Sequence, residues 1–145
     1  MNMNTQKKRA GFTLLELLVV ISIIGILIAI GSAAFSTAQK KGRDARRRGD
    51  IKALQDGFEQ YYSENSGSYG ATCAAMNSTV YFPGGFPTDP KGATYTGYDY
   101  NTGSGCSTSA YVVCATLETG GGNSSSGTSF VSASDGDYFC LTNLQ

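Results

Sequence analysis

The sequence predicts an α+β fold in which a long N-terminal helix packs against a small antiparallel β-sheet head with disulfides. Helical spacing of apolar residues continues to about residue 62, and no proline precedes Pro83. Beyond residue 64 the chain is rich in Gly, Ser, Thr and Asn, with short aromatic and β-branched runs between turn residues. All four cysteines lie in this second part. One helix followed by several strands is the order expected of an α+β domain.

The first part contains an apolar segment, residues 12–35, which reads FTLLELLVVISIIGILIAIGSAAF. Its one ionisable side chain is Glu16. As a helix the segment would measure about 36 Å, which exceeds the roughly 30 Å hydrocarbon core of a bilayer. Backbone groups inside lipid must be hydrogen-bonded within their own segment, so we expect a single membrane-spanning helix.

The Glu16 carboxylate is unfavourable in such a segment, since an acid at the bilayer centre costs about 2.5–3.5 kcal/mol. Its position near the N-terminal end of the segment lowers that cost. Two interpretations stay open: the side chain reaches the membrane interface, or it is retained to bind a cationic partner.

Residues 36–64 are predicted to continue the helix as an amphipathic stem. Apolar residues recur here mostly at spacings of three and four, which marks one face of a helix. That face comprises Ala45, Ile51, Leu54, Phe58, Tyr61 and Tyr62. Residues 65–68, Asn-Ser-Gly-Ser, suit a C-terminal cap, so we expect the helix to end there.

Residues 65–145 are predicted to form the small head. Three runs have the composition of strands: residues 93–100, 110–118 and 137–143. Residues 120–128, GGGNSSSGT, are predicted to be a flexible loop. The sheet would cover the apolar face of the stem, because a head of this size has little core of its own.

Four cysteines, Cys73, Cys106, Cys114 and Cys140, lie in the head. An even number in a small extracytoplasmic domain predicts two disulfides, for which three pairings are possible. We favour Cys114–Cys140, because the two strongest predicted strands would place these residues side by side, and Cys73–Cys106 by elimination. A four-thiolate zinc site is the alternative, but the chain has no closely spaced cysteine pair of the kind such sites use.

Little in the sequence suggests catalysis or a cofactor. The chain has no histidine, no nucleophile–base pair and no glycine-rich phosphate loop, so we do not expect an enzyme. Asp135 and Asp137 could supply hard oxygen ligands to calcium, although two acids at this spacing are also typical of a solvated turn. Apart from that calcium candidate, no metal site or cofactor is predicted.

Charge is unevenly distributed along the chain. Eleven basic and eleven acidic side chains give a formal charge of zero, yet residues 40–48 carry six cations and one acid, and the head is mostly acidic. The basic run is either a solvated helix face beside lipid headgroups or a surface that pairs with the acidic head of another subunit. The rest of the chain offers no basic surface, which argues against nucleic-acid binding.

The junction between the basic N-terminus and the apolar segment contains a specific motif. Residues 7–9 are Lys-Lys-Arg, and residues 11–16 read Gly-Phe-Thr-Leu-Leu-Glu. This pattern resembles the leader of type IV prepilins and type II secretion pseudopilins. The resemblance implies a leader at residues 1–11, cleavage by a prepilin peptidase between Gly11 and Phe12, and N-methylation of Phe12. It also implies that Glu16 pairs with the Phe12 amine of a neighbouring subunit.

Two further stretches extend the resemblance. Residues 58–69, with Tyr61 and Tyr62 before an Asn/Gly turn, resemble the end of the stem helix in pseudopilins and related pilins. Residues 82–92, with their Pro-Thr-Asp-Pro turn, resemble part of a pseudopilin head.

The resemblance implies a structural subunit of a helical filament, in either a type IV pilus or a type II secretion pseudopilus. Its partners would be copies of itself, prepilin peptidase, an inner-membrane assembly platform and, before assembly, membrane lipid. The implied location is a bacterial or archaeal-type cell membrane, crossed once with the N-terminus cytoplasmic and the head extracytoplasmic, and then a periplasmic or extracellular filament.

Orientation and function each have an alternative. The positive-inside rule alone would place the basic residues 40–48 in the cytoplasm, whereas the prepilin-type leader and the cysteines favour the opposite orientation. The alternative function is a bitopic, membrane-anchored extracytoplasmic binding module with an uncleaved helix.

Overall fold

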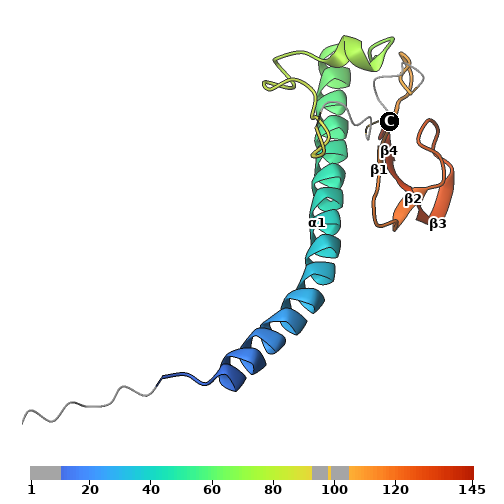
Figure 1. The fold of residues 1–145 in the computed structure, drawn as a ribbon. Helices are drawn as coiled ribbons and strands as arrows, with labels where there is room; N and C mark the ends of the chain where they lie inside the picture. Colours follow the sequence, from blue (N-terminus) through green and yellow to red (C-terminus); the bar gives the residue numbers. More distant parts are fainter. Residues whose placement is uncertain (1–10, 93–97, 99–104) are drawn as a thin grey trace, which may run out of the picture. The chain divides into compact units, whose positions relative to one another are not determined.

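The computed structural model describes residues 11–92, residue 98 and residues 105–145. One long helix, α1 (Leu14–Glu64), is followed by a short 3₁₀ helix, η1 (Cys73–Met76). Four strands complete the order: β1 (Val112–Thr116), β2 (Gly122–Ser124), β3 (Ser132–Gly136) and β4 (Tyr138–Thr142). Figure 1 shows this helix-then-sheet order, which confirms the predicted α+β class. The chain divides into two compact units, residues 1–38 and residues 39–145, and each is described by itself.

Helix α1 ends at Glu64, where the sequence predicts a cap. The Asn65 side chain donates to the Tyr61 carbonyl at 2.8 Å, and the Gly67 N–H donates to the Tyr62 carbonyl at 3.1 Å. Ser66 and Gly67 have φ of 57° and 74°, the left-handed conformation that reverses a chain after a helix. These bonds satisfy carbonyls that the last turn of a helix leaves open.

The four strands form one antiparallel sheet in the order β1-β4-β2-β3. Strands β1 and β4 lie within the predicted runs 110–118 and 137–143, so both predictions are confirmed. Their register places Cys114 directly opposite Cys140. The third predicted run, 93–100, lies outside the described residues except for Tyr98, which forms an isolated bridge with Ala115.

The prediction of a flexible loop at residues 120–128 is wrong for residues 122–124, because they form β2. A side chain on Gly122 would collide with the facing backbone of Tyr138, so glycine is what permits the close approach of these strands. The Asn123 side chain takes the place of a neighbouring backbone as the hydrogen-bonding partner of Cys140 in β4. Its amide donates to the Cys140 carbonyl at 2.8 Å, and its oxygen accepts the Cys140 N–H at 2.7 Å. Composition alone does not reveal such a strand, since Gly, Asn and Ser have low β-propensity.

Strand β3 was not predicted either. It contains Asp135, for which the sequence suggested a solvated turn or a calcium site. Its pairing partner is β2, with Gly122 opposite Gly136 and Ser124 opposite Ser132. Asp137 occupies the short connection from β3 to β4.

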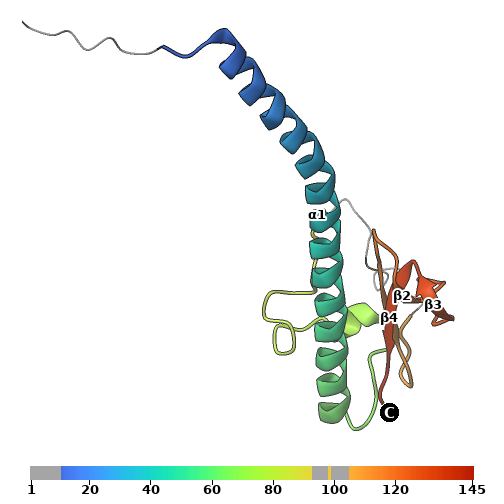
Figure 2. The same cartoon turned by 90° about the horizontal axis from the view of Figure 1, so that it is seen from below.

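The core of the unit 39–145 lies between α1 and the sheet. Ile51, Leu54 and Phe58 of α1 and Val113 and Ala115 of β1 are completely buried there. Figures 1 and 2 show the sheet along one side of this part of α1 and the segment 77–92 along the other. The sheet therefore covers the apolar face of the stem, as predicted.

The predicted apolar face is wrong at its beginning, where Ala45 is exposed. Asp44 and Arg47 are buried in its place, with exposures of 3% and 0%. Charged residues can be buried at these positions because they satisfy one another, as described below.

Two disulfides link Cys73 to Cys106 and Cys114 to Cys140, the pairing favoured from the sequence. The first ties η1 to the segment that leads into β1, and the second joins β1 to β4. Since all four sulfurs are in disulfides, no thiolate is left for the alternative zinc site.

Candidate functional site

Residues of the N-terminal motif surround the start of α1. Gly11, Phe12 and Thr13 precede the helix, and Phe12 is 91% exposed. The bond between Gly11 and Phe12 therefore lies outside the helix, in a segment whose residues are exposed.

Thr13 and Glu16 form a reciprocal cap on α1. The Thr13 N–H and hydroxyl each donate to Glu16 Oε2 at 2.8 Å, and the Glu16 N–H is 3.2 Å from Thr13 Oγ1. This is a capping box, which satisfies backbone donors at the first turn of a helix. The sequence reasoning missed it, although Thr followed three residues later by Glu is its usual signal.

The apolar segment 12–35 exposes its large side chains from Phe12 to Phe35, with values between 46% and 91%. By length and composition α1 could cross a membrane. An apolar surface of this extent is found on proteins that contact lipid or other protein. The segment is thus available both for membrane insertion and for packing against other helices.

A cluster of charged residues joins the stem to the head within the unit 39–145. We call it the charged clamp, and it consists of Arg43, Asp44, Arg47, Asp89, Lys91 and Glu118. Arg47, at its centre, is fully buried and forms ion pairs with Asp89 at 2.7 Å and with Asp44 and Glu118 at 2.8 Å each. Fork-like pairing of a guanidinium with carboxylates is among the strongest polar contacts in proteins.

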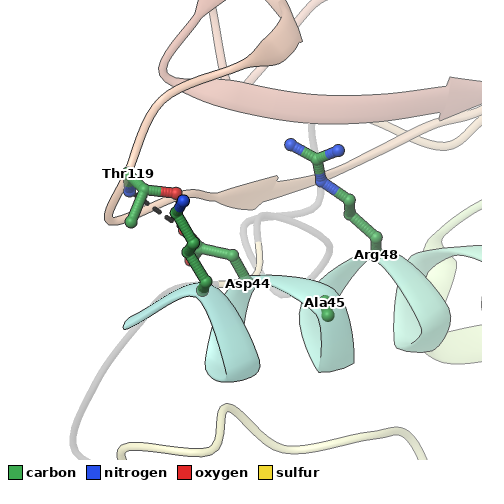
Figure 3. A pocket seen from close by; sticks show the side chains of 5 residues that line it. Asp44, Ala45, Arg48 and Thr119 are labelled. Atoms are coloured by element: carbon green, nitrogen blue, oxygen red, sulfur yellow. Dashed lines mark hydrogen bonds between the residues drawn. The ribbon is translucent and has the colours of Figure 1, made fainter. Parts of the chain in front are cut away.

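The outer residues of the clamp complete it. Glu118 also accepts from Arg43 at 2.7 Å and lies 3.0 Å from Lys91 Nζ. Asp44 accepts the backbone N–H groups of Glu118 and Thr119, at 2.9 Å each, and the Thr119 hydroxyl at 2.7 Å (Figure 3). Helix α1, the segment 77–92 and the turn after β1 are therefore fixed to one another through charged groups.

These contacts shift the ionisation of the clamp residues. Hydrogen bonds from Arg43 hold the pKa of Glu118 far below its ordinary value, and Lys91 and Arg47 contribute to this shift. Burial alone would raise the pKa of Asp44, but the N–H of Glu118, the Thr119 hydroxyl and Arg47 outweigh it and lower that pKa. The hydrogen bond to Asp89 raises the pKa of Arg47. Glu118, Asp44 and Arg47 are therefore charged at neutral pH.

Within the single chain, the clamp and one further ion pair give partners to three cations of the basic run, Arg43, Arg46 and Arg47. Arg43 and Arg47 do pair with acids of the head, but with acids of their own chain. Arg46 pairs with Asp50 in the next turn of α1. Lys40, Lys41 and Arg48 are the cations of the run for which the described residues show no acidic partner.

A second polar site was not expected from the sequence. The Glu59 carboxylate accepts from the hydroxyls of Tyr111 at 2.8 Å and Tyr69 at 3.0 Å, and from the Leu144 N–H at 3.0 Å. Burial and the bond to Glu59 raise the pKa of both tyrosines. Glu59 thereby holds the C-terminal segment against α1, which is a structural role.

The calcium candidates Asp135 and Asp137 belong neither to the charged clamp nor to the Glu59 site. Asp135 accepts the Gly121 N–H at 2.7 Å, and Asp137 is exposed. No group of three or more His, Cys, Asp or Glu side chains suited to a metal ion occurs among the described residues. Calcium binding at Asp135 and Asp137 stays a prediction.

Comparisons with known proteins agree with the motif. Residues 6–32 match the family model described as "Prokaryotic N-terminal methylation motif". Type II secretion system core protein G of Pseudomonas aeruginosa is 31% identical over 93 residues, which is 64% of each chain. The protein of the same name from Vibrio cholerae is 31% identical over 107 residues, covering 64% of this chain and 73% of the relative. No solved structure matches the chain.

A type IV major pilin, PilA of Myxococcus xanthus, is 37% identical over 57 residues, 39% of this chain and 26% of the relative. The chain thus spans just under two thirds of the Pseudomonas aeruginosa protein and about a quarter of PilA. The methylation motif, the exposed apolar helix that follows it and the extended similarity to core protein G lead to one conclusion. The chain belongs to the superfamily of type IV pilins and type II secretion pseudopilins.

Proposed function

We propose that this protein is a structural subunit that is processed after Gly11 and assembles through its apolar helix into a helical filament. One observation carries the proposal: the Gly11–Glu16 motif directly precedes a segment whose large apolar side chains are all exposed. Assembly would transfer this surface from lipid into a core made of neighbouring helices.

In the proposed assembly, Glu16 changes partner. In the single chain its carboxylate is held by Thr13. Cleavage would create a positive amine on Phe12, and a desolvated carboxylate gains most from a partner of opposite charge. Glu16 would then neutralise the Phe12 amine of a neighbouring subunit, which sets the axial register of the filament.

The proposed topology has the leader in the cytoplasm and the head outside it. The two disulfides support this orientation, because such bonds persist in oxidising compartments. Prepilin peptidase and an inner-membrane assembly platform are the partners this route requires.

Mass spectrometry of the N-terminus of the protein purified from its own cells tests the proposal. A chain that begins with N-methylated Phe12 is the expected result. An intact Met1 on the mature, functional protein would contradict it and favour a bitopic, membrane-anchored binding module.

The kind of filament is also a proposal. Similarity to core protein G extends over 93 residues, whereas similarity to PilA covers 57 residues. This difference favours a secretion pseudopilus over a surface pilus. Deletion should then abolish secretion of exoproteins, and loss of surface filaments with normal secretion would show the opposite assignment to be right.

A further inference from the structure

Two short stretches of the head match the acceptor pattern for N-glycosylation, in which Asn is followed by any residue except proline and then by Ser or Thr. They are residues 77–79, Asn-Ser-Thr, and residues 123–125, Asn-Ser-Ser. Such triplets arise often in a chain rich in Ser and Thr, so the pattern by itself does not identify a site. The conformation of each triplet in the folded head separates the two.

The Asn123 amide is already hydrogen-bonded on both of its polar atoms. Its nitrogen donates to the Cys140 carbonyl at 2.8 Å, and its oxygen accepts the Cys140 N–H at 2.7 Å. Ser124, the residue that follows it, is fully buried. A sugar on this nitrogen would add bulk to the contact between β2 and β4. We therefore exclude Asn123 as an acceptor in the folded head.

The Asn77 amide, in contrast, is free. Asn77 follows η1 on the surface, and its backbone N–H donates to the Ala74 carbonyl at 3.1 Å, which fixes the backbone there. Its side chain forms no hydrogen bond with any described residue. Thr79, the third residue of the triplet, is also exposed, and its hydroxyl has no partner in the described part of the chain. Both groups that the acceptor pattern requires are therefore accessible.

The surface around Asn77 lacks charge. Residues 65–88 contain no Asp, Glu, Lys or Arg. The exposed apolar residues of this stretch include Ala71, Ala74, Ala75 and Val80. An exposed apolar surface without charges favours association in water, whereas a glycan is bulky and solubilising. A glycan on Asn77 would cover this part of the head.

We propose that Asn77 is an N-glycosylation site, to which an oligosaccharyltransferase transfers a glycan from a polyprenol phosphate-linked donor. In this transfer the side-chain nitrogen of Asn77 forms a bond to the anomeric carbon of the first sugar. The bond from that carbon to the donor phosphate breaks, and the amide nitrogen releases one proton. The inference rests on the extracytoplasmic head contained in the proposed function, because such transferases act on that side of the membrane.

Peptide mapping by mass spectrometry of the full chain, purified from its own cells, tests the site. We expect the peptide that contains Asn77 to carry the mass of at least one sugar, and the peptide that contains Asn123 to be unmodified. Asn77→Gln should abolish the modification. Thr79→Ala should abolish it as well, because this change destroys the triplet and leaves the Asn77 amide in place.

Two further variants serve as controls. Thr79→Ser keeps the acceptor pattern, so the sugar should be retained. Ser125→Ala destroys the second triplet, and the sugar on Asn77 should be unchanged. Asn77, Thr79 and Ser125 are all exposed, so none of these variants should prevent folding. An unmodified Asn77 in the wild-type chain, or a sugar that survives both Asn77→Gln and Thr79→Ala, would overturn the proposal.

The same spectra separate this inference from the proposed function. A chain that begins with N-methylated Phe12 and carries no sugar on Asn77 would show that the glycosylation site alone is wrong. A chain that retains Met1 and carries the sugar would support the site and the extracytoplasmic head, and it would contradict processing after Gly11.

Discussion

Arg47 has no exposed surface and binds three carboxylates, of which Asp44 lies on the same helix and Asp89 and Glu118 lie far away in the sequence. Removing a charge from water is unfavourable, and the arrangement is tolerated because each charge meets an opposite one. Such a cluster as a whole contributes modestly to the free energy of unfolding, yet removing a single charged member lowers that free energy strongly. The clamp therefore fixes the geometry of stem and head more than it adds to stability.

Arg47→Met keeps much of the side-chain volume but leaves Asp44, Asp89 and Glu118 without their central cation. We expect the free energy of unfolding to fall by about 3–5 kcal/mol. Denaturant unfolding of the full chain in detergent, followed by near-ultraviolet circular dichroism, measures this loss. Lys52→Met is the control, because Lys52 and Asp56 form an exposed pair at 2.9 Å, and it should cost less than about 1 kcal/mol. Equal losses of stability in the two variants would show that the buried clamp stabilises the fold no more than an exposed ion pair does.

Protonation of Glu118 makes the stability that the clamp contributes depend on pH. Arg43, Lys91 and Arg47 lower the pKa of Glu118 in the folded chain, while in the unfolded chain it is about 4.3. The stabilisation is fully present above the unfolded value and is lost as the pH falls below about 4. Unfolding measured from pH 7 to pH 2 should show this decline, and Glu118→Gln should flatten it. Parallel pH profiles for the two proteins would contradict the assignment.

At the scale of elements, the sheet combines two kinds of strand. Strands β1 and β4 are held by apolar side chains and by the Cys114–Cys140 bridge. Strands β2 and β3 have few apolar residues and depend on close backbone contact and on the amide of Asn123. The two pairs should respond differently to substitution.

Gly122→Ala tests whether β2 and β3 depend on close backbone contact. The added methyl group would meet the backbone of Tyr138, which cannot move without disturbing β4. Overpacking of this sort costs about 1–3 kcal/mol, which the same denaturant unfolding detects. Gly84→Ala is the matched control, since open space surrounds Gly84, and its stability should change by less than about 1 kcal/mol. A neutral Gly122→Ala would mean that β2 is not packed as described.

At the scale of the whole molecule, one chain combines a compact unit, residues 39–145, with an apolar segment that has no partner within the described chain. The compact unit has a core, two disulfides and an internal charge network. The apolar segment needs lipid or other subunits. This division agrees with a subunit that resides in a membrane before it assembles into a filament.

Glu16→Gln should impair filament assembly without affecting membrane insertion. Membrane insertion depends on apolar surface, so the variant should still be found in the membrane fraction. An unpaired Phe12 amine inside the filament costs several kcal/mol, so filament yield should fall at least about tenfold. Sheared filaments quantified by immunoblotting measure this yield. Ser22→Ala, which removes a hydroxyl that donates to the Leu18 carbonyl of its own helix, is the control. Normal yield from Glu16→Gln would refute the role of Glu16.

Much of the fold was predictable because its signals are local. The absence of proline, the cap at residues 65–67 and the strand-like composition of β1 and β4 can all be recognised within a few residues. The motif at Gly11–Glu16 is local too. The clamp was not predictable, since Asp89 and Glu118 lie 42 and 71 residues from Arg47 and only the fold brings them together. Strand β2 was missed because glycine there allows close packing, whereas in sequence it indicates a turn.

The Cys114–Cys140 bridge lies below the segment that connects β2 to β3. Both cysteines are at most 1% exposed, and the Ser126 carbonyl is 3.4 Å from the Cys140 sulfur. An oxidoreductase that forms this bond must reach the thiols before that segment closes over them. Oxidation of the two thiols must therefore precede closure of this segment, and the closed segment then shields the bond from reductants.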